Sequence, residues 1–178
     1  MSELSKYNEL RSIYKYYIDL YIELFQLKTE NEEELNSIYK KIKTELIDSK
    51  NHLPRNVIRD VLNIIPYNNR YVKSYLVLAE LISKDYHITV VTKIPIISNY
   101  LFNKEYGIKL DKSQYFNDDT LENLDIHSEN TIYRAIMYND KERFIPFTER
   151  DGFDKDQKLK SKLYPYSDFG YSLLELCC

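Results

Sequence analysis

Residues that interrupt helices are scarce in this sequence, which contains 3 Gly and 5 Pro among 178 residues. Because glycine and proline mark most turns, so few of them favour long helices with short connections over many short strands. Hydrophobic residues make up 43% of the chain and charged residues 30%, a balance typical of folded domains rather than disordered segments. The length suits one domain or a short run of stacked repeats. We therefore expect an all-α protein.

The net charge indicates which classes of partner to expect, and the cysteines indicate the cellular compartment. A formal net charge of -3 gives the whole chain no general attraction for nucleic acid or for an anionic membrane. No apolar run is long enough to span a bilayer, and residues 1–6 lack the features of a signal peptide. The 2 cysteines are adjacent at the end of the sequence and cannot cross-link a fold, which indicates a reducing compartment. We expect a cytoplasmic protein without nucleic-acid or membrane partners.

Apolar residues recur at helical spacing through the first part of the chain. Asn31 and Glu34 have the spacing of a capping box, and Pro54 suits the first position of a helix. The polar residues from 109 to 125 predict a surface loop. We therefore expect residues 1–125 to form an N-terminal region of about five helices arranged in hairpins. The expected helices cover residues 5–27, 31–49, 54–65, 69 to about 82, and 95–107.

The end of the chain, residues 168–178, has the pattern of a helix that starts just after a tight hairpin. Gly170 takes the hairpin tip and Ser172 is the capping residue, which apolar helix residues follow. Cys177 and Cys178 take the positions of two small residues that pack between helices. This is the order of residues at the opening of an ankyrin repeat, and here it stops one turn into the helix.

An earlier stretch in the same region fits the same pattern. Asn130 would cap its first helix, Ala135 would be the first small residue, and Asn139 would end the helix in a left-handed turn. Pro146 interrupts the second helix and should bend or shorten it. The two stretches lie further apart than the period of roughly 33 residues of a plain ankyrin repeat. We assign the additional residues to a polar insert at 150–164.

Taken together, most of the chain resembles the leading region of large protist ankyrin-repeat proteins, a domain of unknown function (DUF3447) composed of degenerate ankyrin repeats. The resemblance implies helical hairpins that stack into an irregular α-solenoid, ankyrin-like in residues 126–178, where the last repeat is truncated. It also implies that further repeats follow Cys178. The residues that carry the resemblance are 64–71, 100–110, 130–147 and 166–178.

The resemblance also implies a function, namely a non-enzymatic protein–protein interaction module that uses no cofactor. Partners of ankyrin repeats commonly contact the hairpin tips and the face formed by the first helix of each repeat. Carried onto this sequence, those places correspond to Ser128 and Glu129 and to Asp168, Phe169 and Tyr171. These five residues are the candidate contacts with an unknown protein partner.

An alternative is a helical structural or oligomerisation domain that caps the solenoid. The sequence has 18 Tyr, and Tyr14, Tyr17 and Tyr21 share one face of the first expected helix. If that face lies outside the core, it would pair with another copy of the chain. A truncated last repeat would also expose apolar surface around Leu173, Leu174 and Leu176 and allow weak self-association.

Four short patterns in the sequence suggest other chemistry. Residues 168–170 spell the magnesium-binding motif of protein kinases, but the other kinase motifs are missing. The three histidines are scattered, and the acidic residues at 151–156 lack the glycine and the closing glutamate of a calcium loop. The basic residues at 155–162 predict a solvated insert, and contact with phosphate or an acidic partner is the alternative. We expect neither a catalytic site nor a metal site.

Overall fold

A computed structural model describes residues 3–49, 52–117, 123–124, 128–166 and 169–176. The chain forms two compact units, Met1–Gln114 (unit 1) and Tyr115–Cys178 (unit 2), which are described one at a time. From the sequence we expected the division after residue 125. Most described residues are helical, which confirms the all-α class. The stacking of hairpins into an ankyrin-like solenoid stays a prediction.

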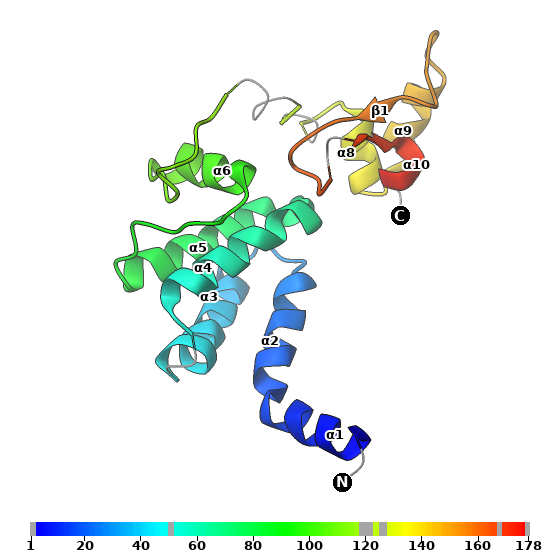
Figure 1. Cartoon of the computed structure of the whole chain (residues 1–178). Helices are drawn as coiled ribbons and strands as arrows, with labels where there is room; N and C mark the ends of the chain where they lie inside the picture. Colours follow the sequence, from blue (N-terminus) through cyan, green and yellow to red (C-terminus); the bar gives the residue numbers. More distant parts are fainter. Residues whose placement is uncertain (1–2, 50–51, 118–122, 125–127, 167–168, 177–178) are drawn as a thin grey trace. The chain divides into compact units, whose positions relative to one another are not determined.

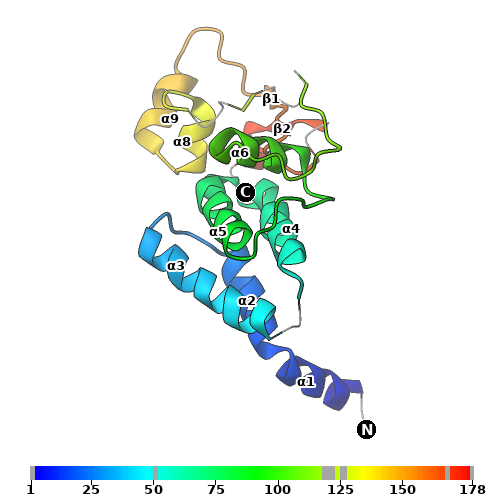
Figure 2. The same cartoon turned by 90° about the vertical axis from the view of Figure 1, so that its left-hand side faces the viewer.

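Unit 1 is built around a hairpin of two helices, α4 and α5. These helices lie side by side, and α3 and α6 lie on opposite sides of the pair (Figures 1 and 2). The apolar faces of α3, α4 and α5 form the core together with the end of α2. The helices of unit 1 are α1 (Glu3–Ile13), α2 (Lys15–Phe25), α3 (Glu32–Lys41) with its π-helical continuation η1 (Ile42–Asp48), α4 (Pro54–Ile64), α5 (Val72–Asp85) and α6 (Ile96–Tyr106).

Several helix ends follow the signals in the sequence. As predicted, α4 begins at Pro54, and α6 ends at Gly107, whose φ of 71° is left-handed. The capping box at α3 is half formed. Asn31 Oδ1 accepts a hydrogen bond from the backbone N–H of Glu34 at 3.1 Å, but the N–H of Asn31 donates to Thr29 Oγ1 at 3.0 Å. The side chain of Asn31 therefore caps the helix, while Thr29 in the preceding loop, rather than Glu34, accepts the hydrogen bond from the N–H of Asn31.

The helix expected at 5–27 is wrong as a single element, because the structure divides it at Tyr14. The backbone of Tyr14, with φ -97° and ψ 12°, separates α1 from α2. Each side chain of α1 from Leu4 to Ser12 is exposed, whereas Leu20 and Leu24 of α2 are buried. Helical spacing places residues on one face, but it does not show that another element covers that face.

A buried tyrosine connects α5 to the segment between α2 and α3. The side chain of Tyr75 is 0% exposed, and its hydroxyl donates to the backbone oxygen of Leu24 at 2.7 Å. The same hydroxyl accepts a hydrogen bond from Asn68 Nδ2 at 2.8 Å. On the preceding residue, Ser74 Oγ donates to the backbone oxygen of Thr29 at 2.6 Å. Burial raises the pKa of Tyr75 to about 12, so the hydroxyl keeps the proton that it donates.

A second polar network holds the segment after α6 against that helix. Asn99 Nδ2 donates to the backbone oxygen of Asp111 and to Gln114 Oε1, both at 2.9 Å, and Asn99 Oδ1 accepts from the N–H of Asp111 at 3.2 Å. Hydrogen bonds from Ser113 hold the pKa of the Asp111 carboxyl below its usual value. Leu110 and Asp111 are buried, so the expected surface loop is wrong at its start.

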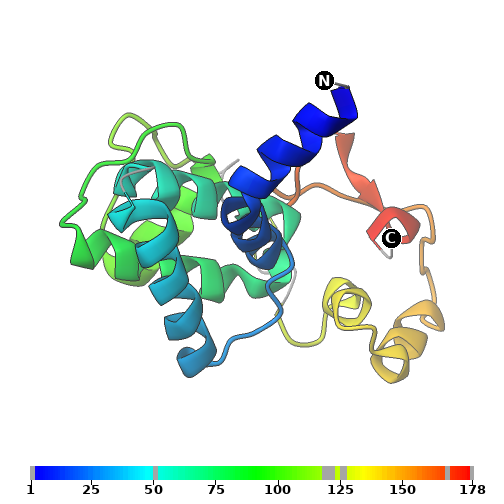
Figure 3. The ribbon, with the colours of Figure 1, turned by 90° about the horizontal axis from the view of Figure 1, so that it is seen from below.

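Unit 2 contains a helical hairpin, a short pair of strands and the beginning of another helix. The two helices of the hairpin, α8 and α9, lie side by side (Figure 3), and α10 packs against α8. Leu159 and Leu163 are buried, so the expected insert at 150–164 is solvated only in part. The elements of unit 2 are α8 (Ile132–Met137), α9 (Lys141–Thr148), β1 (Lys158–Leu159), β2 (Tyr171–Ser172) and α10 (Leu173–Leu176).

Candidate interaction site

Two helix starts in unit 2 use the same kind of cap. Thr131 Oγ1 accepts a hydrogen bond from the N–H of Arg134 at 3.1 Å, and Ser172 Oγ accepts one from the N–H of Glu175 at 3.3 Å. The expectation that Asn130 caps α8 is wrong by one residue, because Asn130 adopts a left-handed φ of 69° just before the cap. Asparagine tolerates this conformation better than most residues.

The cap of α10 is a complete capping box. The carboxylate of Glu175 accepts hydrogen bonds from the backbone N–H and the hydroxyl of Ser172, both at 2.8 Å. The N–H bond contributes most to holding the pKa of Glu175 below its usual value. Glu175 was not among the residues that we predicted to cap this helix. The spacing of Ser172 and Glu175 was the signal that could have found this role.

The turn between α8 and α9 confirms the prediction for Asn139. Its φ of 53° is left-handed, and its N–H donates to the backbone oxygen of Ile136 at 3.0 Å. The next N–H, of Asp140, donates to the backbone oxygen of Ala135 at 2.8 Å, which completes a Schellman motif. Asp140 Oδ1 then accepts from the N–H of Arg143 at 3.1 Å and caps α9. One residue pair therefore ends α8 and starts α9.

Of the expected small residues, Ala135 is buried as predicted. The other pair, Cys177 and Cys178, lies outside the described residues. Pro146 lies inside α9, which continues to Thr148, and the expected bend or shortening at this residue stays a prediction.

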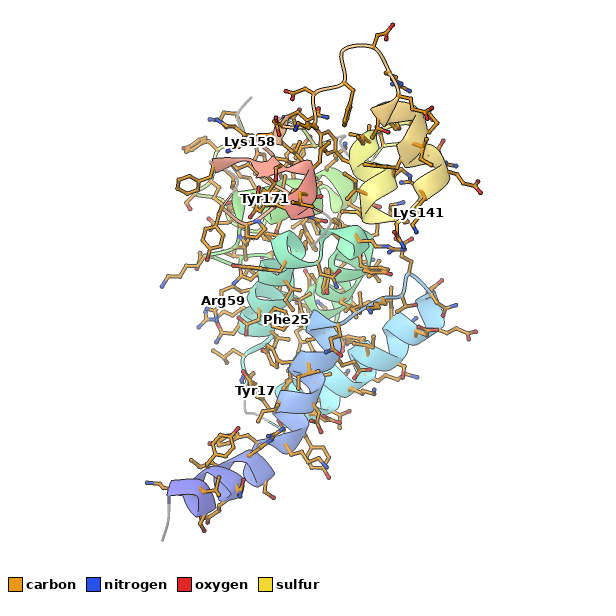
Figure 4. The ribbon with its side chains drawn as sticks, turned by 90° about the vertical axis from the view of Figure 1, so that its right-hand side faces the viewer. Tyr17, Phe25, Arg59, Lys141, Lys158 and Tyr171 are labelled. Atoms are coloured by element: carbon orange, nitrogen blue, oxygen red, sulfur yellow. The ribbon has the colours of Figure 1, made fainter. Side chains whose placement is uncertain are left out.

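Gly170 lies at the start of β2, where it is needed for two reasons. Its φ is 68°, and a Cβ atom at this position would lie 3.3 Å from the backbone oxygen of Leu159 and from the Cβ of Lys158. The two strands pair antiparallel, with Leu159 opposite Tyr171 and Lys158 opposite Ser172. Lys158 and Tyr171 are labelled on the two strands in Figure 4. Glycine therefore allows β1 and β2 to approach each other.

The candidate contacts near β2 differ in their surroundings. Phe169 is 81% exposed. Tyr171 is half-buried, since its hydroxyl donates to the backbone oxygen of Pro165 and its ring centre lies 5.6 Å from that of Tyr164. Phe169 is thus available for contact, whereas Tyr171 contacts Pro165 and Tyr164.

The other candidate contacts lie before α8 or outside the described residues. Ser128 and Glu129 are exposed just before α8, and the backbone oxygen of Ser128 accepts a hydrogen bond from the hydroxyl of Thr131 at 3.2 Å. Asp168 lies outside the described residues. Among the backbone hydrogen bonds of the described residues, none joins Ser128 or Glu129 to Phe169.

Two further exposed apolar residues flank Phe169 in the sequence. Tyr166 is 76% exposed and Leu174 is 77% exposed, whereas Leu173 is buried beside α8. We expected apolar surface at Leu173, Leu174 and Leu176 to be exposed, but only Leu174 is fully so, because Leu173 is buried and Leu176 is half-buried. Tyr166 was not predicted, because nothing in its local sequence distinguishes an exposed tyrosine from a packed one.

The described ranges contain neither a metal-binding cluster nor a membrane-spanning helix. Within them, no three His, Cys, Asp or Glu side chains come together in an arrangement that could hold a metal ion. Among the helices of those ranges, none combines the length and the apolar character needed to cross a bilayer. His127 lies outside them.

Comparisons with protein-family models, with curated proteins and with solved structures find no match for this chain. The resemblance to DUF3447 and to ankyrin repeats therefore stays a prediction from the sequence.

Proposed function

We propose that this chain is a non-enzymatic protein–protein interaction module whose contact region includes the β2 end of unit 2. The observation that carries the proposal is that three large apolar side chains close together in the sequence there are exposed, Tyr166, Phe169 and Leu174. Exposed groups of large apolar residues commonly mark sites of protein–protein contact. Aromatic residues are also enriched among those that contribute most to binding.

The backbone that carries these side chains is well supported, which favours binding. The Tyr171 hydroxyl and the β1 and β2 pairing hold the segment before α10, and the capping box of Ser172 and Glu175 holds the start of α10. A backbone that is ordered before binding loses less conformational entropy when the partner docks. Phe169 and Leu174 therefore lie within two residues of backbone that is paired or capped.

The change Phe169→Ser is expected to reduce recovery of the partner from a cell extract about tenfold or more, because an aromatic hot spot contributes about 2 kcal/mol. The measurement is quantitative capture on the immobilised chain, with bound proteins identified by mass spectrometry. Tyr67→Ser is the matched control, because Tyr67 is a 64% exposed aromatic residue in unit 1. If both variants recover every bound protein as well as the wild type, the β2 region is not the contact region.

A second candidate function is self-association through the first helix. Leu4, Tyr7 and Leu10 of α1 and Tyr14 after it are all exposed and recur at helical spacing. An apolar stripe of this kind is suited to pairing with a second copy of the helix. This observation favours the oligomerisation domain that the tyrosine-rich sequence suggested.

The residues of that surface differ from those expected. Tyr21 is half-buried and its hydroxyl donates to Asp60 Oδ2 of α4 at 2.9 Å. The ring of Tyr17 lies 4.6 Å from that of Tyr21 and 5.0 Å from that of His52, between ring centres. Figure 4 labels Tyr17 on α2. Tyr17 and Tyr21 therefore pack within unit 1, and Tyr14 alone of the expected patch is exposed.

The double change Leu10→Ser and Tyr14→Ser is expected to abolish any concentration-dependent dimer, because it removes two apolar side chains from the stripe. Sedimentation velocity over a hundredfold range of concentration measures the average mass. The control pair is Leu53→Ser and Tyr67→Ser, which removes the same residue types from exposed positions elsewhere in unit 1. A wild-type chain that stays monomeric throughout, or equal association of both double variants, would exclude this surface.

A further inference from the structure

We propose that the groove between α8 and α9 binds an acidic peptide segment of the partner through Arg134, Arg143 and Arg150. This inference rests on the proposed function, since it names the chemistry of a partner and a second place where unit 2 contacts it. The groove has a volume of about 580 Å³ and lies wholly within unit 2. That volume falls in the range of ligand-binding sites in proteins.

Two of the three arginines are supported by aromatic rings in the groove. The guanidinium carbon of Arg134 lies 4.7 Å from the ring centre of Tyr138, and that of Arg150 lies 4.2 Å from the ring centre of Phe147. Such cation–π contacts orient the guanidinium by its flat face. Its N–H donors lie in the plane of the group and match the two oxygens of a carboxylate. The rings therefore position cationic groups suited to acidic side chains.

The charges around the groove leave a positive excess. Arg143 is paired with Asp140, whose Oδ2 lies 3.3 Å from Arg143 Nε, and Glu142 also lines the groove. Against these two carboxylates stand three guanidinium groups, whereas the whole chain carries a net charge of -3. The groove lining thus carries a formal excess of positive charge, whereas the net charge of the whole chain is negative. This contrast favours an acidic segment over a basic or neutral one.

Part of the lining of the groove is apolar. Ala135, Pro146 and Phe147 line it, and none of the described residues of α9 is buried. Ile145 of the same helix is 50% exposed. A helix that carries three apolar side chains and Pro146 without burying any of them has surface that a partner can cover. The fitting peptide therefore combines carboxylates with at least one apolar side chain.

The test uses a fluorescein-labelled peptide of sequence EEFEELEE and measures its fluorescence anisotropy with the full chain at low salt. We expect saturable binding that Arg134→Gln with Arg150→Gln weakens about tenfold or more, because two charge-assisted contacts are lost. The matched control is Lys155→Gln with Lys160→Gln, which removes the same charge from exposed positions outside the groove. The control should bind within about twofold of the wild type.

Further peptides and variants distinguish binding in the groove from nonspecific charge attraction. The peptides KKFKKLKK and QQFQQLQQ should not bind, and Arg134→Lys with Arg150→Lys should recover part of the affinity, since lysine keeps the charge but not the planar donors. Equal loss in the glutamine variants of the groove and of the control would overturn the inference. So would equal binding of the three peptides, absence of saturable binding, or full affinity in the lysine variant. Thermal unfolding by circular dichroism checks that every variant is folded.

The outcome for the groove is distinguishable from that for the proposed function. If Phe169→Ser loses its partner while the peptide never binds, the interaction module stands and the groove inference fails. If the peptide binds through the arginines but no protein is captured in a Phe169-dependent way, the groove binds acidic peptides and the β2 contact region fails.

Discussion

The change Tyr75→Ala is expected to lower the free energy of unfolding of the chain by about 4 kcal/mol, the range for removing a large buried aromatic ring. The ring is completely buried, so its removal leaves a cavity next to α4 and the end of α2. The change also leaves the backbone oxygen of Leu24 without a tyrosine donor and Asn68 Nδ2 without the hydroxyl acceptor. Urea denaturation followed by far-UV circular dichroism measures the loss.

Two companion variants separate the ring from the hydroxyl. Tyr75→Phe keeps the ring and should cost about 1 to 2 kcal/mol, the cost of unsatisfied buried partners. Tyr67→Ala removes an exposed tyrosine and should change the free energy of unfolding by less than about 0.5 kcal/mol. If Tyr75→Ala costs no more than Tyr67→Ala, Tyr75 does not link α5 to the end of α2.

The second large effect is expected for Asn99→Ala, which should cost about 3 kcal/mol because it breaks three hydrogen bonds at a buried site. The backbone N–H and oxygen of Asp111 would both lose their amide partner, and both lie in buried surroundings. Loss of these bonds should also release the segment 109–114 from α6. Hydrogen exchange at the Asp111 N–H should then become faster than in the wild type, which can be followed by NMR.

Asn103→Ala is the matched control, since it changes the same residue type one turn later in α6. It should leave the exchange rate at Asp111 unchanged and cost less than about 1 kcal/mol, because Asn103 is only half-buried. An Asn99 variant with wild-type stability and wild-type exchange at Asp111 would show that the side chain does not hold this segment.

Some candidate contact residues were predicted from the sequence and others were not, and the difference has a physical reason. Phe169 was found from its place beside Gly170 in the ankyrin pattern, and it is exposed. The groove arginines were missed, because Arg134 and Arg150 come from different segments and meet only when α8 and α9 pair. Sequence spacing reports neighbours on one helix, whereas a groove needs the positions of two.

The sequence by itself determined those features that depend on residues within one or two turns of each other. Pro54 at a helix start, Gly107 at a helix end and Asn139 in a left-handed turn are of this kind. Each of these residues restricts or frees its own backbone angles, so its effect does not need the rest of the fold. The all-α class follows from the same local preferences summed along the chain.

Only the tertiary structure decided which helical faces are covered and which polar side chains are buried. Tyr75 bonds to Leu24, 51 residues away, and Asn99 bonds to Asp111, 12 residues away, while the exposure of α1 depends on which segments lie against it. An apolar stripe looks the same in a sequence whether a neighbour covers it or water does. Burial is a property of the packed pair of elements and not of either element alone.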